Sequence, residues 1–182
     1  MTNGKLNKTS KPMPEEISAT QVAGRPVSYS RSEMLEVVLP NDANQLGYIL
    51  GGRVMHLIDI AGAIAAHRHC HSHVVTASVD YLDFRHSIRV GELIVLKSSV
   101  NRVFNTSMEV GVKVFSENYI TDERVHTSSA YLTFVTIDEN HRPRPIPPLI
   151  LETDEDRRRY READARRQIR LAQRYKRRPA ES

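Results

Sequence analysis

The sequence contains a single cysteine, Cys70, among its 182 residues. One cysteine excludes an intrachain disulfide and any CxxC redox or metal motif. Long hydrophobic runs are also missing, because the longest covers residues 60–66 and a membrane helix needs about 20 residues. The first thirty residues are polar and include Pro12, Pro14 and Pro26, with no apolar segment typical of a signal peptide. We therefore expect a cytoplasmic protein without membrane contact.

The net charge of +4 has a local origin. Residues 151–182 contain 11 Lys and Arg against 7 Asp and Glu, whereas the rest of the chain has 15 of each sign. A balanced body lacks the basic face of a nucleic-acid-binding domain. The tail alternates arginines with acids, which favours pairing within the helix over a phosphate-binding stripe. We expect no nucleic-acid partner, and binding measured at low and high salt would decide the alternative.

Hydrophobic periodicity predicts one α+β domain of ordinary size. A helix is expected over residues 53–69, where alanine and glycine dominate and would let a sheet approach closely. Five segments favour strands, and the period-two alternation is clearest over 108–115. These segments are residues 33–39, 74–84, 92–100, 108–115 and 125–137. Short connections between the last strands indicate an antiparallel sheet.

Both ends of the chain differ in composition from this body. Residues 1–28 are rich in Lys, Thr, Ser, Pro and Gly and are expected to form a disordered leader. The globular domain is expected over 29–141. Residues 142–182 are expected to form a Pro-rich linker and a charged helix over 152–176, solvated or lightly docked. Three acid-before-base pairs at i,i+4 support that helix: Asp154–Arg158, Glu155–Arg159 and Glu162–Arg166.

Asp59 is the unusual residue of the apolar helix. An ionised carboxylate is costly to bury unless it is paired or hydrogen-bonded. A structural role would pair Asp59 with His56 or expose it to water. A functional role would make it a general base or nucleophile in a partly dry cleft.

Two features beside this helix could complete a site. Gly51 and Gly52 precede the helix, where unpaired N–H groups and the helix dipole favour a substrate oxyanion. A simple tight turn is the alternative. Asn44 lies in the preceding loop, where it either makes a turn hydrogen bond or polarises a carbonyl or places a water.

Other reaction types lack their motifs. The chain has no nucleophile elbow, dinucleotide-binding glycine motif or P-loop. A histidine-rich run suggests zinc, but it spans a helix end and a loop, and no second cluster completes a ligand set. We therefore expect no metal. The run comprises His67, His69, Cys70, His71 and His73.

Several spaced motifs resemble the hot-dog-fold acyl-CoA thioesterases, especially the brain-type cytosolic acyl-CoA hydrolases and their YciA-like bacterial relatives. The resemblance covers about residues 30–140. Its motifs occur in the family's order: residues 39–44, Gly47, Gly51-Gly52, residues 55–62, 68–70 and 74–80, Phe84, and residues 107–110 and 116–118.

The resemblance implies a long central helix wrapped by an antiparallel β-sheet, assembled as a homodimer and further as a trimer of dimers. It implies hydrolysis of fatty acyl-CoA to free CoA and a carboxylic acid, with no cofactor because CoA is part of the substrate. Asp59 would be the general base or nucleophile and Asn44 would come from the other chain. The amides of Gly51 and Gly52 would form the oxyanion site.

We expect the CoA end of the substrate at Arg102, Asn105, Thr106 and Ser107, which offer a cation and hydroxyls for phosphates. An ordinary polar hairpin is the alternative. Two other functions stay open. One is a non-catalytic acyl-CoA sensor, which usually carries a helix-turn-helix that the leader does not show. The other is a hot-dog dehydratase, which leaves the thioester intact.

Overall fold

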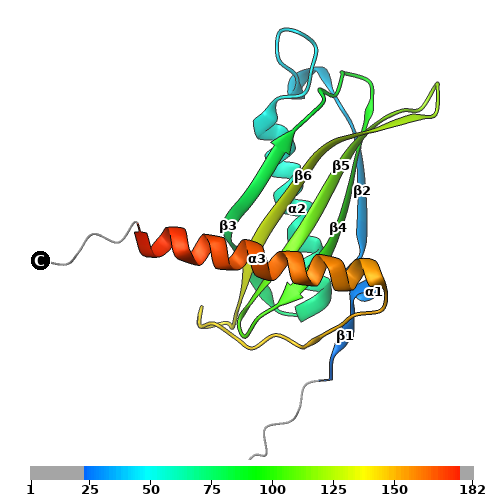
Figure 1. The fold of residues 1–182 in the computed structure, drawn as a ribbon. Coiled ribbons are helices and arrows are strands. Elements are labelled where there is room, and N and C mark those ends of the chain that lie inside the picture. Colours follow the sequence, from blue (N-terminus) through cyan, green and yellow to red (C-terminus); the bar gives the residue numbers. More distant parts are fainter. Residues whose placement is uncertain (1–22, 177–182) are drawn as a thin grey trace, which may run out of the picture.

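The computed structural model describes residues 23–176 and has a five-stranded antiparallel sheet wrapped around one long helix (Figure 1). The helix is α2 (Gly51–Cys70), and the strand order is β2-β4-β5-β6-β3. The strands are β2 (Ser32–Val37), β3 (His73–Phe84), β4 (Leu93–Val103), β5 (Ser107–Asn118) and β6 (Glu123–Ile137). The hot-dog fold predicted from the sequence is confirmed, with element ends shifted by a few residues.

Small side chains on α2 allow the sheet to approach it closely. Ala61, Ala65 and Ala66 are buried against the strands. A Cβ added at Gly62 would lie 3.0 Å from the Phe134 ring of β6, so only glycine fits there without displacement. The helix ends at His71, whose left-handed backbone (φ 48°) and N–H bond to the His67 carbonyl form the C-terminal cap.

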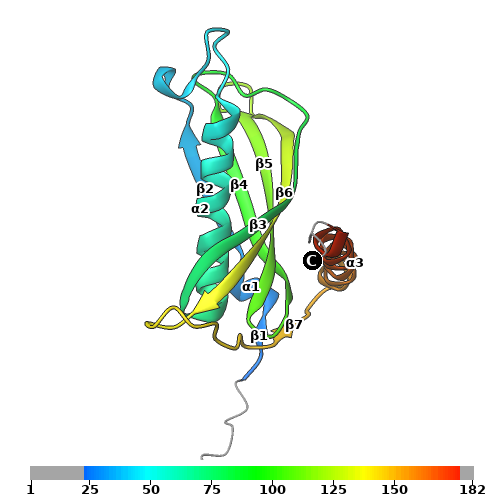
Figure 2. The ribbon, with the colours of Figure 1, turned by 90° about the vertical axis from the view of Figure 1, so that its left-hand side faces the viewer.

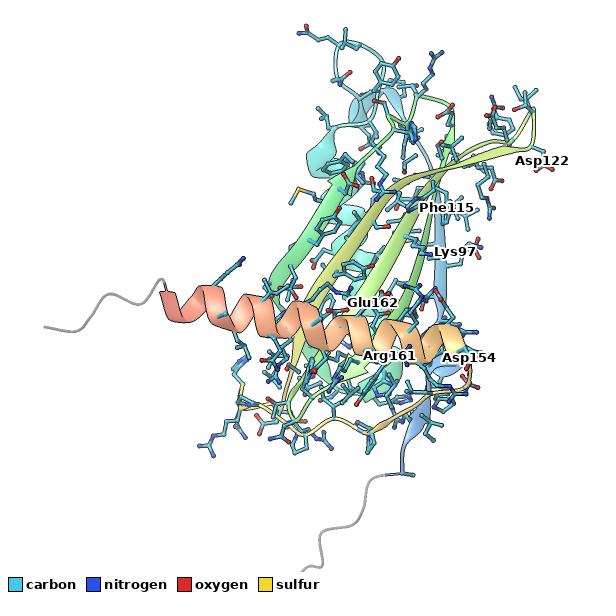
Figure 3. All side chains as sticks on the ribbon, viewed as in Figure 1. Lys97, Phe115, Asp122, Asp154, Arg161 and Glu162 are labelled. Carbon is cyan, nitrogen blue, oxygen red and sulfur yellow. The ribbon has the colours of Figure 1, made fainter. Side chains whose placement is uncertain are left out.

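Helix α3 (Asp154–Lys176) lies on the sheet face opposite α2 (Figure 2). It crosses the sheet from the β2–β4 side, where Figure 3 labels Asp154, toward β3. Ala163 of this helix is fully buried, so α3 is docked on the sheet rather than simply solvated. Three ion pairs also join it to the sheet: Asp164–Arg102, Arg166–Glu109 and Arg170–Asp80.

The N-terminal segment also contributes to the fold. Residues 1–22 of the predicted leader lie outside the described residues. The last part of that leader differs from the expectation, because β1 (Arg25–Pro26) pairs with β7 (Leu149–Ile150), and α1 (Val27–Ser30) follows. Val27 and Ser30 are buried, and the Ser30 hydroxyl accepts a hydrogen bond from the Val100 N–H. This segment therefore packs against β7 and β4 as part of the folded domain.

Two further features bear on the site. A short 3-10 helix, η1 (Pro40–Asp42), opens the loop that contains Asn44. Strand β3 is an edge strand, so one side of its backbone has no partner within residues 23–176.

Within the same residues, no helix is long and apolar enough to cross a membrane.

Candidate active site

Asp59 lies two turns into α2, where its carboxylate is half-buried and faces β3. The Thr76 hydroxyl donates a hydrogen bond of 2.6 Å to Asp59 Oδ1. The pairing with His56, one of the structural alternatives, is not found among the described residues, and Thr76 is the partner instead. Asp59 Oδ2 has no hydrogen-bond partner in the same part of the chain, which leaves one carboxylate oxygen available to a water or a substrate.

Thr76 is a candidate site residue that sequence reasoning did not single out. It lies in a run of residues typical of a strand. Threonine is common in strands, so its presence there does not by itself indicate a functional site. The pairing of β3 with β6 in this register places it against α2. To identify Thr76 from the sequence, one would have to know which face of β3 points toward Asp59.

The loop around Asn44 is held in place by ion pairs. Arg53, in the first turn of α2, contacts Glu36 at 2.8 Å and Asp42 at 3.1 Å. Asn44 Oδ1 accepts hydrogen bonds from the N–H groups of Leu46 (2.9 Å) and Tyr48 (3.2 Å). The turn role is therefore present, and it uses the carbonyl oxygen of the side chain. The amide NH₂ of this exposed residue is left to act as a donor.

The start of α2 presents open backbone donors. Leu50 is the N-cap and provides no side-chain hydrogen bond, and no acid lies in the first turn. The N–H groups of Gly51 and Gly52 have no acceptor within residues 23–176. Both glycines are exposed, and a Cβ at Gly52 would meet no atom within 4 Å. An anionic oxygen could therefore reach these amides.

These groups fall into two sets on one chain. Asn44, Gly51 and Gly52 lie together, since the Leu50 N–H bonds to the Asp42 carbonyl. A helix rises 1.5 Å per residue, so Asp59 lies about 10 Å along the axis from Gly52. One carbonyl carbon under attack cannot reach both sets within a single chain.

The residues predicted to bind CoA have other contacts. Arg102 lies 3.1 Å from Asp164 and 4.2 Å from the Tyr160 ring centre, both on α3. The Asn105 carbonyl accepts from Ile146 N–H, next to Pro147, whose carbonyl bonds to His69 near the end of α2. The hairpin with Asn105, Thr106 and Ser107 is thus at the opposite end of α2 from Gly51. A CoA role for these four residues stays a prediction.

The histidine-rich run does not form a metal centre in the described part of the chain. His69 Nε2 lies 2.9 Å from the Pro147 carbonyl, and burial lowers the pKa of His69 below its usual 6.5. Burial also raises the pKa of the Cys70 thiol, which disfavours a nucleophilic thiolate.

A cavity of about 600 Å³ opens between the sheet and the first half of α3. Lys97, Lys113 and Phe115 line it from the outer face of the sheet, and Figure 3 labels the first and last of these. Its lining includes none of Asn44, Gly51, Gly52, Asp59 and Thr76, and the sheet separates it from Asp59.

Comparison with known proteins gives a consistent result. The family model of the Thioesterase superfamily matches residues 46–121. Acyl-coenzyme A thioesterase 11 of Mus musculus is 40% identical over 151 residues, which are 82% of this chain and 25% of that protein. The mouse cytosolic acyl coenzyme A thioester hydrolase is matched over 37% of its length. The chain thus spans between a quarter and two fifths of these curated relatives.

Solved structures match over nearly their whole length. An apo hexameric acyl-CoA thioesterase has a TM-score of 0.81 and 41% identity, covering 84% of this chain and 97% of that one. The acyl-CoA hydrolase of Staphylococcus aureus, solved with butyryl coenzyme A, coenzyme A and coenzyme A disulfide, has a TM-score of 0.79 and 31% identity, covering 84% and 93%. With the fold, the family model and these identities in agreement, the chain belongs to the acyl-CoA thioesterases of the Thioesterase superfamily.

Proposed function

We propose that this protein hydrolyses acyl-CoA thioesters to free CoA and a carboxylic acid. The observation that carries the proposal is the Asp59 carboxylate, fixed through one oxygen by Thr76 and open at the other. The S. aureus hydrolase has been solved with Asn, Asp and Thr each replaced by alanine. Those three residues are separated by fifteen and seventeen positions, the same spacing as Asn44, Asp59 and Thr76.

The chemistry follows from which atoms remain available. Asp59 Oδ2 takes a proton from water, the water oxygen attacks the thioester carbon, and the C–S bond breaks. The proton then passes to the sulfur of the leaving CoA. A positioned base contributes about 10²–10⁴-fold in rate. Direct attack by Asp59 through an anhydride is the other route that the same geometry allows.

The carbonyl oxygen of the substrate needs donors as negative charge develops. Asn44 offers only N–H because its Oδ1 is occupied by the loop. We assign its amide to the carbonyl oxygen, together with the open N–H groups of Gly51 and Gly52. One such donor is typically worth about 10²–10³-fold.

The active site is then shared by two copies of the chain, with Asp59 from one and Asn44, Gly51 and Gly52 from the other. The exposed edge of β3 is the surface proposed to join them, because it has unpaired backbone and exposed Val75, Val79 and Tyr81. Pairing two β3 edges would make one continuous sheet. A further assembly into a trimer of dimers is supported by the hexameric neighbour. A cytoplasmic location is supported by the relative named as cytosolic.

Product analysis tests the function directly. Purified protein is incubated with acyl-CoAs of increasing chain length, and free thiol and carboxylic acid are quantified. Equal amounts of both products are expected. A changed acyl chain with the thioester intact would instead identify a dehydratase. Tight acyl-CoA binding without any product would identify a sensor.

A further inference from the structure

Helix α3 contacts β3 through a buried carboxylate. The Asp80 side chain is only 5% exposed and accepts hydrogen bonds from Ser78 Oγ at 2.6 Å and Thr133 Oγ1 at 2.8 Å. Its charge is balanced by the guanidinium of Arg170, which also contacts Thr133. A buried carboxylate with an ionic partner resists displacement, because separating the pair leaves a charge without compensation.

Asp80 and Thr76 lie on the same strand but face opposite layers. Residues four apart on a regular strand point to the same face of the sheet. Here Thr76 points to α2 and Asp80 to α3, as their hydrogen bonds show. The pairing of β3 with β6 is irregular between Thr76 and Ser78 and again between Val79 and Tyr81. The first irregularity inserts one extra residue between Thr76 and Ser78, so Thr76 and Asp80 point to opposite faces of the sheet.

This geometry makes the β3 segment sensitive to support from outside. A bulge interrupts the ladder of hydrogen bonds, so residues 76–81 are held to β6 less regularly than the rest of β3. A hydroxyl that must contact a catalytic carboxylate tolerates little movement, and a displacement of 1 Å can cost about 10²-fold in rate.

We propose that Arg170 and Asp80 are positioning residues for the active site. Arg170 anchors Asp80, the anchored bulge fixes the path of β3, and that path places the Thr76 hydroxyl on Asp59. The C-terminal helix therefore acts on catalysis through the sheet, without touching substrate. The predicted loss of kcat rests on the proposed hydrolase function. The predicted loosening of β3 rests only on these contacts.

The chain offers a matched control one helical turn earlier. Arg166 pairs with Glu109 at 2.6 Å, and the Glu109 side chain is 2% exposed. The partners are again a guanidinium of α3 and a buried carboxylate of the sheet. Glu109 belongs to β5, which pairs with β4 and β6 but not with β3, so Glu109 is connected to β3 only through its cross-strand neighbour Thr133. Loss of either pair weakens α3 docking, but only loss of the Arg170 pair releases β3.

The experiment compares Arg170→Met with Arg166→Met in the full chain, using thiol release from butyryl-CoA. We expect Arg170→Met to lower kcat about 10-fold with KM nearly unchanged, and Arg166→Met to keep kcat within about twofold. Arg170→Lys should recover part of the rate. Because each methionine variant leaves a buried acid unpaired, the neutral pairs Arg170→Met with Asp80→Asn and Arg166→Met with Glu109→Gln provide a second comparison. Equal kcat losses in the two sets would overturn the proposal.

A double-mutant cycle tests the route through Thr76. In a Thr76→Val background, Arg170→Met should change kcat by less than about twofold, because the contact it positions is already gone. An undiminished effect would contradict the proposal. Hydrogen exchange separates this inference from the proposed function. Faster exchange of residues 76–81 in Arg170→Met, but not in Arg166→Met, is expected whether or not thioester is hydrolysed, and equal exchange in both would refute the anchor.

Discussion

Replacing Thr76 by valine removes the hydroxyl that holds Asp59 while preserving the shape of the side chain. The lost hydrogen bond is 2.6 Å long and is made to a carboxylate. Such bonds are worth about 1.5–3 kcal/mol, which corresponds to about a 10- to 100-fold loss of kcat if the orientation of Asp59 is needed only during reaction. KM should change little, because Thr76 reaches the substrate only through Asp59.

Folding should be nearly unaffected by this change. Thr76 is exposed in the single chain, and valine is at least as favourable as threonine in a strand. The assay is thiol release under saturating acyl-CoA, with a thermal unfolding scan of the same samples. Thr76→Ser, which keeps the hydroxyl, should retain most of the wild-type kcat. Full activity in Thr76→Val, or an equal loss in the serine variant, would refute the assigned role.

Three further outcomes follow from the structure. Asn44→Asp keeps the acceptor for Leu46 and Tyr48 but loses the NH₂ donor, so kcat should fall about 10²-fold at unchanged Tm; a lower Tm with normal kcat would indicate a loop role alone. Gly62→Val should destabilise the fold by about 1–3 kcal/mol in urea unfolding, because even a Cβ reaches 3.0 Å from Phe134; an unchanged midpoint would show that Phe134 moves aside freely. Burial lowers the pKa of His69 below 6.5, so the unfolded chain binds its proton first and stability should fall as pH drops below about 6.5. In His69→Gln, the difference in unfolding free energy between pH 7.5 and pH 5 should shrink, and an unchanged difference would exclude His69 as its source.

The central helix and the five strands could be predicted because their signals are local. Alternation over 108–115 and small residues over 53–69 reflect the faces that each element buries. Docking of α3 could not be predicted in the same way. Its inner face contains the buried Ala163, but Arg166 and Arg170 on the same helix bind Glu109 and Asp80, which are distant in sequence. The sequence pattern therefore left a solvated helix and a lightly docked helix as alternatives.

In the candidate site too, some residues have a local sequence signal and others are placed only by the tertiary structure. Asp59 is visible in the sequence because a carboxylate interrupts an apolar helix face, and Gly51 and Gly52 are visible because they precede that helix. Thr76 becomes a site residue only through strand register, which no local pattern contains. The Arg102 hypothesis considered the charge of Arg102 but not its partner Asp164, because the sequence does not show where on the sheet the C-terminal helix docks.

Mixing two inactive variants tests the shared active site most directly. Asp59→Asn and Asn44→Ala are purified separately, co-refolded in equal amounts, and assayed for thiol release. In a mixed dimer, one of the two sites receives an intact Asp59 from one chain and an intact Asn44 from the other. With random pairing, half of the dimers are mixed and each has one intact site. The mixture should therefore recover about a quarter of the wild-type activity at equal protein concentration. A mixture as inactive as its parents, with mixed dimers verified by mass, would contradict a site shared between two chains.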